Sequence, residues 1–296
     1  MDETRAWREQ NRRSWNHATP VHNARKADVA TWIAAGNSTL FAEEVALLGD
    51  LSGRHVAHVM CNAGEDTLGL VRLGADAVGV DISDTAIDAA RALSAATGVP
   101  AAFVREDVYD WLETTDHRFD DVFSSYGGIG WLPDLPRFFR GVARVLRPGG
   151  RFVLQDFHPL CWSIDAYGRA ADDYFMDDPL LTPEGVSDYV GLSAEGLTPM
   201  GKVEGEKWRN PEPAVSFQWT LADQLTALAR AGLVLDALTE QPWANGCRIH
   251  DDLIMDEQRR WHRRPGIAKL PLMFGVVAHK PEAPTAPVRP TGSQDG

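Results

Sequence analysis

The chain of 296 residues is poor in cysteine and carries fewer basic than acidic residues. Its three cysteines, Cys61, Cys161 and Cys247, are too few and too widely spaced for a disulfide framework or a zinc site. The formal charge is −13, from 29 Lys and Arg against 42 Asp and Glu, and this balance leaves no basic stripe to neutralise a phosphate backbone. The composition therefore argues against nucleic acid as a partner and against a bound metal.

The sequence also lacks a long apolar run and a basic opening segment followed by an apolar one. No stretch approaches the roughly 20 apolar residues that span a bilayer, and no secretory signal pattern opens the chain. We therefore expect no membrane association and a cytoplasmic location, where reducing conditions suit free cysteines. A hydrophobic content of 44% is nevertheless enough to build a large core.

Apolar periodicity predicts strands and helices that alternate along the chain. Predicted strands lie at 55–61, 77–80, 101–104, 121–125, 151–157, 233–238 and 272–279, and predicted helices at 40–48, 64–73, 85–96, 108–112, 135–146 and 220–231. Strands that alternate with helices form parallel sheets joined by right-handed crossovers. The predicted fold class is α/β, with a Rossmann-like, doubly wound, mostly parallel sheet of seven strands.

The regions outside this alternation predict the domain organisation. Residues 1–39 are polar but contain several tryptophans, which favours an N-terminal helical flap over a disordered tail. Residues 40–280 are predicted to be the Rossmann-like domain. Within it, residues 160–219 are rich in Asp, Gly, Pro and aromatics and are predicted to form a cap or insert after the fifth strand. The Pro-rich residues 281–296 are predicted to be a disordered tail.

Polar residues follow three successive predicted strands. The turn Cys61-Asn62-Ala63-Gly64 comes after the first strand, Asp81 ends the second, and Asp107 follows the third. Ligands of open parallel sheets bind at these carboxyl ends, where Asp81 could accept hydrogen bonds from both ribose hydroxyls and Asp107 one from an adenine amine. Each aspartate could instead cap the next helix. Together the three positions suit an adenosine ligand without phosphates.

The ordered series of motifs resembles the class I S-adenosylmethionine-dependent methyltransferases. It consists of Val59 to Leu68, Gly79 to Ser83, Glu106 to Val108, Tyr126 to Gly128, Trp131 to Leu135, Arg147 to Gly150 and His158-Pro159, with Trp15 to His22 near the start. More narrowly, it resembles a bacterial small-molecule subgroup whose first motif has the form Gln-Cys-x-x-Gly-x-Asp-Thr-Leu. The resemblance extends over about residues 10 to 280.

This resemblance implies the cofactor S-adenosylmethionine and a set of site residues. The implied cofactor-binding residues are Trp15, His22, Cys61, Asn62, Gly64, Asp66, Thr67, Asp81, Ile82, Asp107, Val108 and Ser125. The substrate-binding residues are Tyr126, Trp131, His158, Trp162 and Trp208, of which Tyr126 and His158 are also the catalytic candidates. His158 could act as a base on the acceptor, or it could belong to a structural His-Pro turn.

The chain departs from the common first motif, which has three glycines and an acidic residue inside the strand. Met60, Asn62 and Gly64 stand at the glycine positions, and His58 at the acidic one. A pyrophosphate needs close backbone approach at several points, so the missing glycines disfavour a nicotinamide cofactor. The carboxylate of the methionine moiety must find its cation or its hydrogen-bond donors elsewhere in the chain.

The predicted function is methyl transfer from S-adenosylmethionine to a nitrogen, oxygen or carbon atom of a small molecule. The acidic and aromatic composition favours an aromatic or heterocyclic metabolite, such as a natural-product scaffold. A nicotinamide-dependent oxidoreductase and a non-catalytic protein that binds adenosylmethionine or forms dimers remain alternatives. Whether the chain forms a homodimer is left open.

Overall fold

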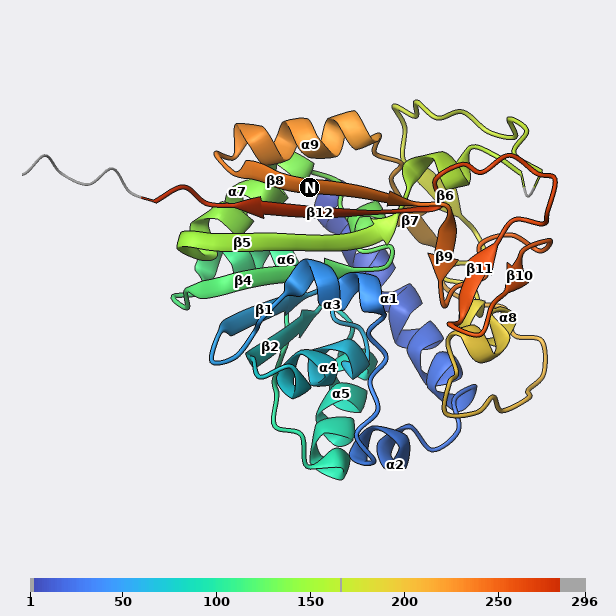
Figure 1. Cartoon of the computed structure of the whole chain (residues 1–296), viewed down its shortest axis with the longest axis horizontal. Coiled ribbons are helices and arrows are strands. Elements are labelled where there is room, and N and C mark those ends of the chain that lie inside the picture. The colour runs from blue at the N-terminus through green and yellow to red at the C-terminus, as the bar shows by residue number, and fades with distance from the viewer. Residues whose placement is uncertain (1–2, 166, 283–296) are drawn as a thin grey trace, which may run out of the picture.

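The computed structural model describes residues 3–165 and 167–282. Its central sheet has seven strands in the order β3-β2-β1-β4-β5-β12-β8. The strands are β1 (His55–Val59), β2 (Asp76–Asp81), β3 (Ala102–Arg105), β4 (Phe119–Ser125), β5 (Leu146–Phe157), β8 (Val234–Gln241) and β12 (Met273–His279). Only β12 runs antiparallel to its neighbours, β5 and β8. The predicted Rossmann-like sheet is therefore confirmed (Figure 1).

Helices cover both faces of this sheet. They are α3 (Ala42–Leu48), α4 (Glu65–Arg72) and α5 (Asp84–Thr97) on one face, and α6 (Val108–Thr114), α7 (Leu135–Val145) and α9 (Leu221–Arg230) on the other. Successive strand residues point to opposite faces, so Val122 joins the core under α7 while Phe123 joins the core under α3 and α4. Burial on both sides explains why the central strands read as nearly continuous apolar runs.

The fifth strand begins earlier than the sequence predicts. The Arg147–Gly150 turn motif lies inside β5, because Leu146 pairs with Phe119 of β4 and the backbone N–H of Gly149 donates to Lys280 O (2.8 Å). The predicted tail at 281–296 lies almost entirely outside the described residues.

Two helices precede the sheet, α1 (Glu3–Ala24) and α2 (Val29–Ala34). Helix α1 contacts α5 on one side and the insert strand β7 on the other. The helical character expected for residues 1–39 is thus present, while the treatment of this segment as a flap stays a prediction.

A cap lies over the carboxyl ends of the parallel strands (Figure 1). It contains the short elements η2 (Pro159–Trp162), β6 (Leu180–Thr182), α8 (Tyr189–Leu192), η3 (Ala194–Gly196) and β7 (Ala214–Ser216). A small sheet of β9 (Trp243–Asn245), β10 (Ile254–Met255) and β11 (Arg260–His262) joins them. The sequence analysis misses this sheet because strands of two or three residues are too short for periodicity to register. A further single turn, η1 (Ile129–Trp131), follows β4.

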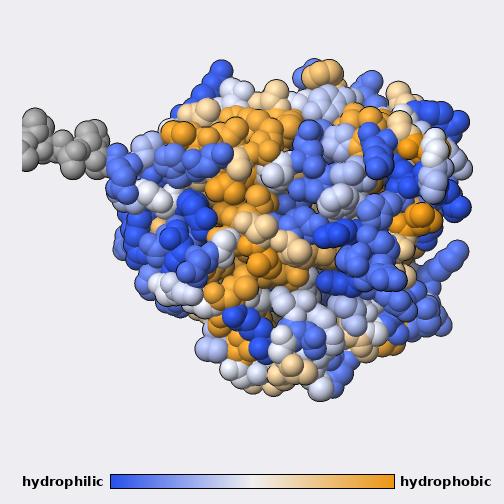
Figure 2. All heavy atoms as spheres, viewed as in Figure 1, coloured by the Kyte–Doolittle hydropathy of each residue, from blue (hydrophilic) through white to orange (hydrophobic). Residues whose placement is uncertain are grey.

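The outer strand of the sheet exposes apolar side chains among charged ones. Strand β8 exposes Val234, Leu235 and Leu238, and Figure 2 shows a broad apolar area on this face of the molecule. Open apolar edges of this kind can pair copies of a chain, so a homodimer stays a prediction. Among the described helices, none is long and apolar enough to cross a membrane.

Candidate active site

A cavity of about 1400 Å³ lies at the carboxyl end of the sheet, beneath the cap and α1. Most of the residues implied by the sequence line it. These are Trp15, His22, Cys61, Asn62, Asp66, Asp81, Ile82, Asp107, Val108, Ser125, Tyr126, Trp131 and Trp162. The structure therefore brings together side chains from the ends of four parallel strands and from the N-terminal helix.

Gly64 and Thr67 support this cavity without lining it. Gly64 has φ +82° and precedes α4, and a Cβ atom there would lie 2.8 Å from both Ala90 and Phe103. Only glycine allows this packing of the turn against α5 and β3. Asn62 (φ +49°) also adopts left-handed geometry, which asparagine tolerates better than most residues.

Asp81 holds this turn in place from the end of β2. Its carboxylate accepts hydrogen bonds from the backbone N–H groups of Asn62 (2.8 Å) and Ser83 (2.9 Å). The capping alternative for Asp81 is wrong, since the side chain of Ser83 caps α5. Burial raises the pKa of Asp81, against the opposing effect of the backbone donors. A carboxylate has about four acceptor positions, so Asp81 keeps acceptor capacity toward the cavity.

Asp107 is the N-cap of α6. Its Oδ1 accepts from the backbone N–H of Tyr109 (2.9 Å) and its Oδ2 from Arg8 Nη1 (2.5 Å). The capping alternative for this residue is thus confirmed, although Asp107 also lines the cavity. Arg8 of α1 is a neighbour that the sequence motifs did not indicate.

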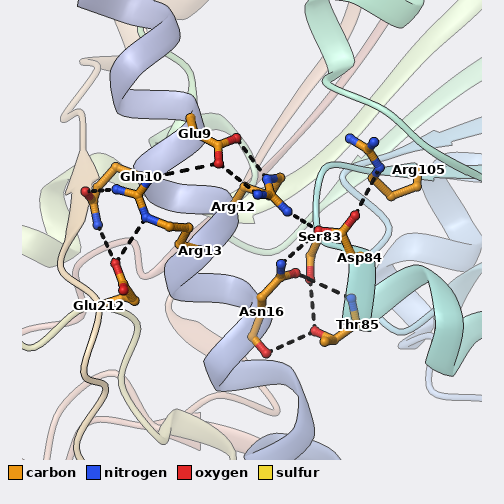
Figure 3. A network of polar contacts seen from close by, with 10 residues as sticks. All are labelled: Glu9, Gln10, Arg12, Arg13, Asn16, Ser83, Asp84, Thr85, Arg105 and Glu212. Atoms are coloured by element: carbon orange, nitrogen blue, oxygen red, sulfur yellow. Dashed lines mark hydrogen bonds and ion pairs between the residues drawn. The ribbon is translucent and has the colours of Figure 1, made fainter.

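Side chains of helix α1 bind both the start of α5 and the insert (Figure 3). Arg12 forms an ion pair with Asp84 at the start of α5, and Asn16 Nδ2 donates to the same carboxylate (2.8 Å). Arg13 Nε reaches Glu212 of the insert (3.2 Å). These contacts place Trp15 and His22 in the cavity wall.

His22 lines the cavity and has a buried ring nitrogen without a hydrogen-bond partner among the described residues. Its Nε2 lies 2.8 Å from the carbonyl oxygen of Ser187 and must donate to it. Nδ1 therefore carries a lone pair, and it has no hydrogen-bond partner within the described part of the chain. Burial lowers the pKa of His22 to about 4, so the imidazole is neutral at pH 7 and presents an acceptor.

A chain of hydrogen bonds connects the first and fourth strands. Ser125 Oγ donates to Asp66 (3.3 Å) and lies 3.4 Å from His58 Nε2. His58 Nδ1 in turn lies 2.8 Å from Thr67 Oγ1. Burial lowers the pKa of His58 to about 3, so the imidazole that replaces the family's acidic residue is neutral. The cofactor-binding role of Thr67 stays a prediction.

Tyr126 is held by two residues that sequence reasoning missed. Its hydroxyl donates to Glu44 Oε2 of α3 (2.6 Å) and accepts from Asn245 Nδ2 of β9 (3.3 Å). Glu44 is fully buried, and burial raises its pKa well above the usual value. Neither residue stands in a recognisable motif, since α3 and β9 reach Tyr126 only in the folded chain.

The prediction that His158 borders the cavity is wrong. The side chain is buried and does not line the cavity. Its Nδ1 accepts from the backbone N–H of Leu160 (3.1 Å), and its Nε2 lies 3.0 Å from Glu240 on β8. These contacts turn the imidazole toward the neighbouring strand, so the His-Pro turn reading is the one that holds.

The three predicted substrate tryptophans differ in position. Trp131 packs edge-on against Trp15, with ring centroids 5.6 Å apart, and Trp162 packs against Phe157 at 5.7 Å. Trp208 does not line the cavity and instead packs, half-buried, against the small core of the insert and α1. It is therefore corrected to a structural residue of the cap.

Asp156, at the end of β5, makes the stability of the folded state depend on pH. Its Oδ1 accepts from the backbone N–H groups of Gly127 and Phe157, yet burial raises its pKa to about 6. Between about pH 4 and pH 6 the folded state binds more protons than the unfolded state, so this group destabilises the fold as the pH rises through that window. Asp156→Asn keeps the acceptor oxygen and cannot ionise.

We expect the stability of wild type relative to Asp156→Asn to fall between pH 4 and pH 6.5, as measured by urea unfolding at each pH. Contributions from the other titrating groups largely cancel in this difference. A difference that stays flat, or that rises with pH, contradicts the raised pKa.

Comparison with known proteins matches this geometry to a family. A family model described as a methyltransferase domain matches residues 56–150. An uncharacterized methyltransferase of Synechocystis sp. is 30% identical over 152 residues, which are 51% of this chain and 69% of that protein. The chain belongs to the methyltransferase family.

Two further relatives of this methyltransferase have names that state an activity. Compared with the Synechocystis protein, one has a lower identity and the other matches a shorter part of this chain. The 2-phytyl-1,4-naphtoquinone methyltransferase of Nostoc punctiforme is 27% identical, over 71% of this chain and 92% of its own. A ubiquinone biosynthesis O-methyltransferase of Alkalilimnicola ehrlichii is 30% identical, over 48% and 56% respectively. The match thus covers about half of that last relative.

Solved structures share the fold of this methyltransferase. An S-adenosylmethionine-dependent methyltransferase from Mesorhizobium loti has a TM-score of 0.53 and 22% identity, over 83% of this chain and 99% of that one. One from Clostridium acetobutylicum has a TM-score of 0.51 and 13% identity, over 77% and 84%. At these identities the likeness concerns the fold alone.

Proposed function

We propose that this methyltransferase transfers a methyl group from S-adenosylmethionine to a small aromatic or heterocyclic acceptor. The observation that carries the proposal is one cavity in which Asp81 and the first-strand turn adjoin a wall of aromatic side chains. The narrower bacterial subgroup, the flap at 1–39 and the insert at 160–219 belong to the same proposal. The relatives' names support methyl transfer, and the fold neighbours support the cofactor.

The residues at the strand ends fit an adenosyl cofactor. Asp81 offers free acceptor capacity to two ribose hydroxyls, and His22 Nδ1 is a buried acceptor without a partner among the described residues. The turn at Asn62 lacks the glycines that a pyrophosphate would need. When bound, the cofactor supplies an electrophilic methyl group on its sulfonium, open to in-line displacement.

The aromatic lining of the cavity suits a flat acceptor. It contains the aromatic side chains of Trp15, Phe41, Tyr126, Trp131, Phe157, Trp162, Phe175, Tyr189, Phe217 and Trp219. Pockets for one small ligand commonly have volumes of roughly 300–1,000 Å³, so 1400 Å³ leaves room for a cofactor and an acceptor together. One named relative is a ubiquinone biosynthesis O-methyltransferase and another a 2-phytyl-1,4-naphtoquinone methyltransferase, and these names support an aromatic acceptor for this chain.

Tyr126 is the proposed residue beside the reacting atom. Its hydroxyl proton is donated to Glu44, so the phenol oxygen can only accept from a further partner. Tyr126 therefore orients a methyl acceptor by accepting a hydrogen bond from the O–H or N–H group of that molecule. Alignment and exclusion of water, rather than a strong base, are what this cavity contributes to the reaction.

Calorimetric titration with S-adenosylmethionine, S-adenosylhomocysteine and NAD in parallel tests the cofactor. We expect both adenosyl ligands to bind and NAD not to bind. Binding of NAD alone would favour the oxidoreductase, and binding of none would refute the proposal. A panel of phenols, quinols and N-heterocycles with mass-spectrometric detection then tests transfer. Cofactor binding without any transfer would favour the non-catalytic alternative.

A further inference from the structure

Arg259 is a cation in the cavity wall without an ion-pair partner among the residues that the structure describes. It lies in the turn before β11, with a left-handed backbone at φ +63°. Its guanidinium stacks on Phe41, 4.3 Å from the ring centroid, and Nη1 donates to the carbonyl oxygen of Gly196 (3.2 Å). Most of its five N–H donors are therefore free to bind a ligand.

Two of the other cations that line the cavity are engaged by carboxylates. Arg8 is paired with Asp107, and Lys26 forms an ion pair with Glu65. Arg248 also lines the cavity, where it stacks over Trp261, donates to the backbone carbonyl of Asp251 and keeps a buried Nε without a partner among the described residues. Arg259 is thus the cation best placed to receive an anionic group at the strand ends.

Arg259 shares the cavity with a carboxylate that it does not contact directly. Its charge interacts with Asp66, Glu44 and Tyr126, which favour the charged form against the effect of burial, which lowers its pKa. Asp66 lies in the first turn of α4 and accepts from Thr39 Oγ1 and Ser125. No direct ion pair joins Arg259 to Asp66 in the described chain. A cation and an anion that stay apart across one cavity match the two charges of an α-amino acid group.

We propose that Arg259 binds the α-carboxylate at the amino-acid end of the cofactor, with Asp66 on the side of the α-ammonium. This inference rests on the proposed function. It supplies the cation that the altered first motif does not provide, from a turn well outside the matched residues 56–150. A half-buried guanidinium is costly until an anion pairs with it, so the binding energy gained there is specific to ligands that carry a carboxylate.

The turn that carries Arg259 is held by contacts with α3 and the cap. Its backbone carbonyl accepts from the N–H of Gly246 (3.0 Å), and the next residue, Arg260, forms an ion pair with Glu43 of α3 (2.5 Å). The bond from Arg259 to Gly196 joins the same guanidinium to the insert. A carboxylate bound here would therefore meet a preorganised donor and would contact the part of the cap that borders the acceptor.

The test compares two adenosyl ligands that differ in the amino-acid group. Full-length wild type, Arg259→Gln and Arg259→Lys are titrated calorimetrically with S-adenosylhomocysteine and with 5′-methylthioadenosine, which has no carboxylate. Arg264→Gln is the matched control, because Arg264 is exposed and lies on the same segment. Arg248→Gln and Lys26→Met test the competing cations.

We expect Arg259→Gln to weaken S-adenosylhomocysteine by roughly 10- to 100-fold, the loss of a charge-assisted contact, and to change 5′-methylthioadenosine by less than about twofold. Arg259→Lys should recover part of the loss, and Arg264→Gln should match wild type. Equal weakening of both ligands, no weakening, or a selective loss in Arg248→Gln or Lys26→Met instead would overturn the assignment. If wild type binds neither ligand, the proposed function itself fails.

Discussion

Replacing Asp81 with alanine should weaken the binding of S-adenosylmethionine by roughly 100-fold or more. A hydrogen bond to a charged group contributes about 1.5–3 kcal/mol, and Asp81 can accept from two ribose hydroxyls. The same carboxylate holds the N–H groups of Asn62 and Ser83, so its loss also loosens the turn. Calorimetry on wild type and variant measures the change.

Asp76→Ala is the matched control for that experiment. Asp76 begins the same strand at its exposed end, where its carboxylate lies 3.0 Å from His55 Nδ1. This variant should bind the cofactor as wild type does. A thermal melt of both variants separates lost contacts from lost folding. If Asp81→Ala is folded and binds S-adenosylmethionine with wild-type affinity, the ribose-binding role of Asp81 is wrong.

Gly64→Ala should cost about 2–4 kcal/mol of unfolding free energy. The substitution combines two effects. A left-handed backbone costs a non-glycine residue about 1–2 kcal/mol, and the new Cβ would lie 2.8 Å from Ala90 and Phe103, where the turn packs on α5 and β3. Urea unfolding of wild type and variant measures the difference.

Gly98→Ala isolates the first of these effects. Gly98 ends α5 with φ +68°, but a Cβ there has no atom within 4 Å. Its cost should therefore stay near 1–2 kcal/mol. Similar losses in the two variants would show that close packing at the first-strand turn does not govern stability.

Local sequence patterns predicted the fold and the site residues at the strand ends. Alternating strands and helices follow from apolar periodicity, which acts over a few residues, and the strand ends carry Asn62, Asp81 and Ser125 because the chain turns there. A parallel sheet brings all its carboxyl ends to one edge. Residues far apart in the chain could therefore be assigned to one cavity without coordinates.

The sequence alone could not tell whether an aspartate after a strand caps the next helix or lines the cavity. Asp107 both caps α6 and faces the cavity, and the sequence alone left the two readings open. Arg8, which binds it, comes from a helix about a hundred residues away. No local pattern connects these two positions, so their pairing depends on how α1 lies across the sheet.

The sequence by itself determined the α/β alternation, the first-strand turn and the acidic residue at the end of β2, because each depends on neighbours along the chain. Only the tertiary structure decided the rest of the site. His158 turns away because β8 brings Glu240 beside it, and Tyr126 is fixed by Glu44 and Asn245. Arg259 reaches the cavity from the hairpin between the short strands β10 and β11. Side-chain direction and long-range contact are set by packing between elements, which periodicity does not encode.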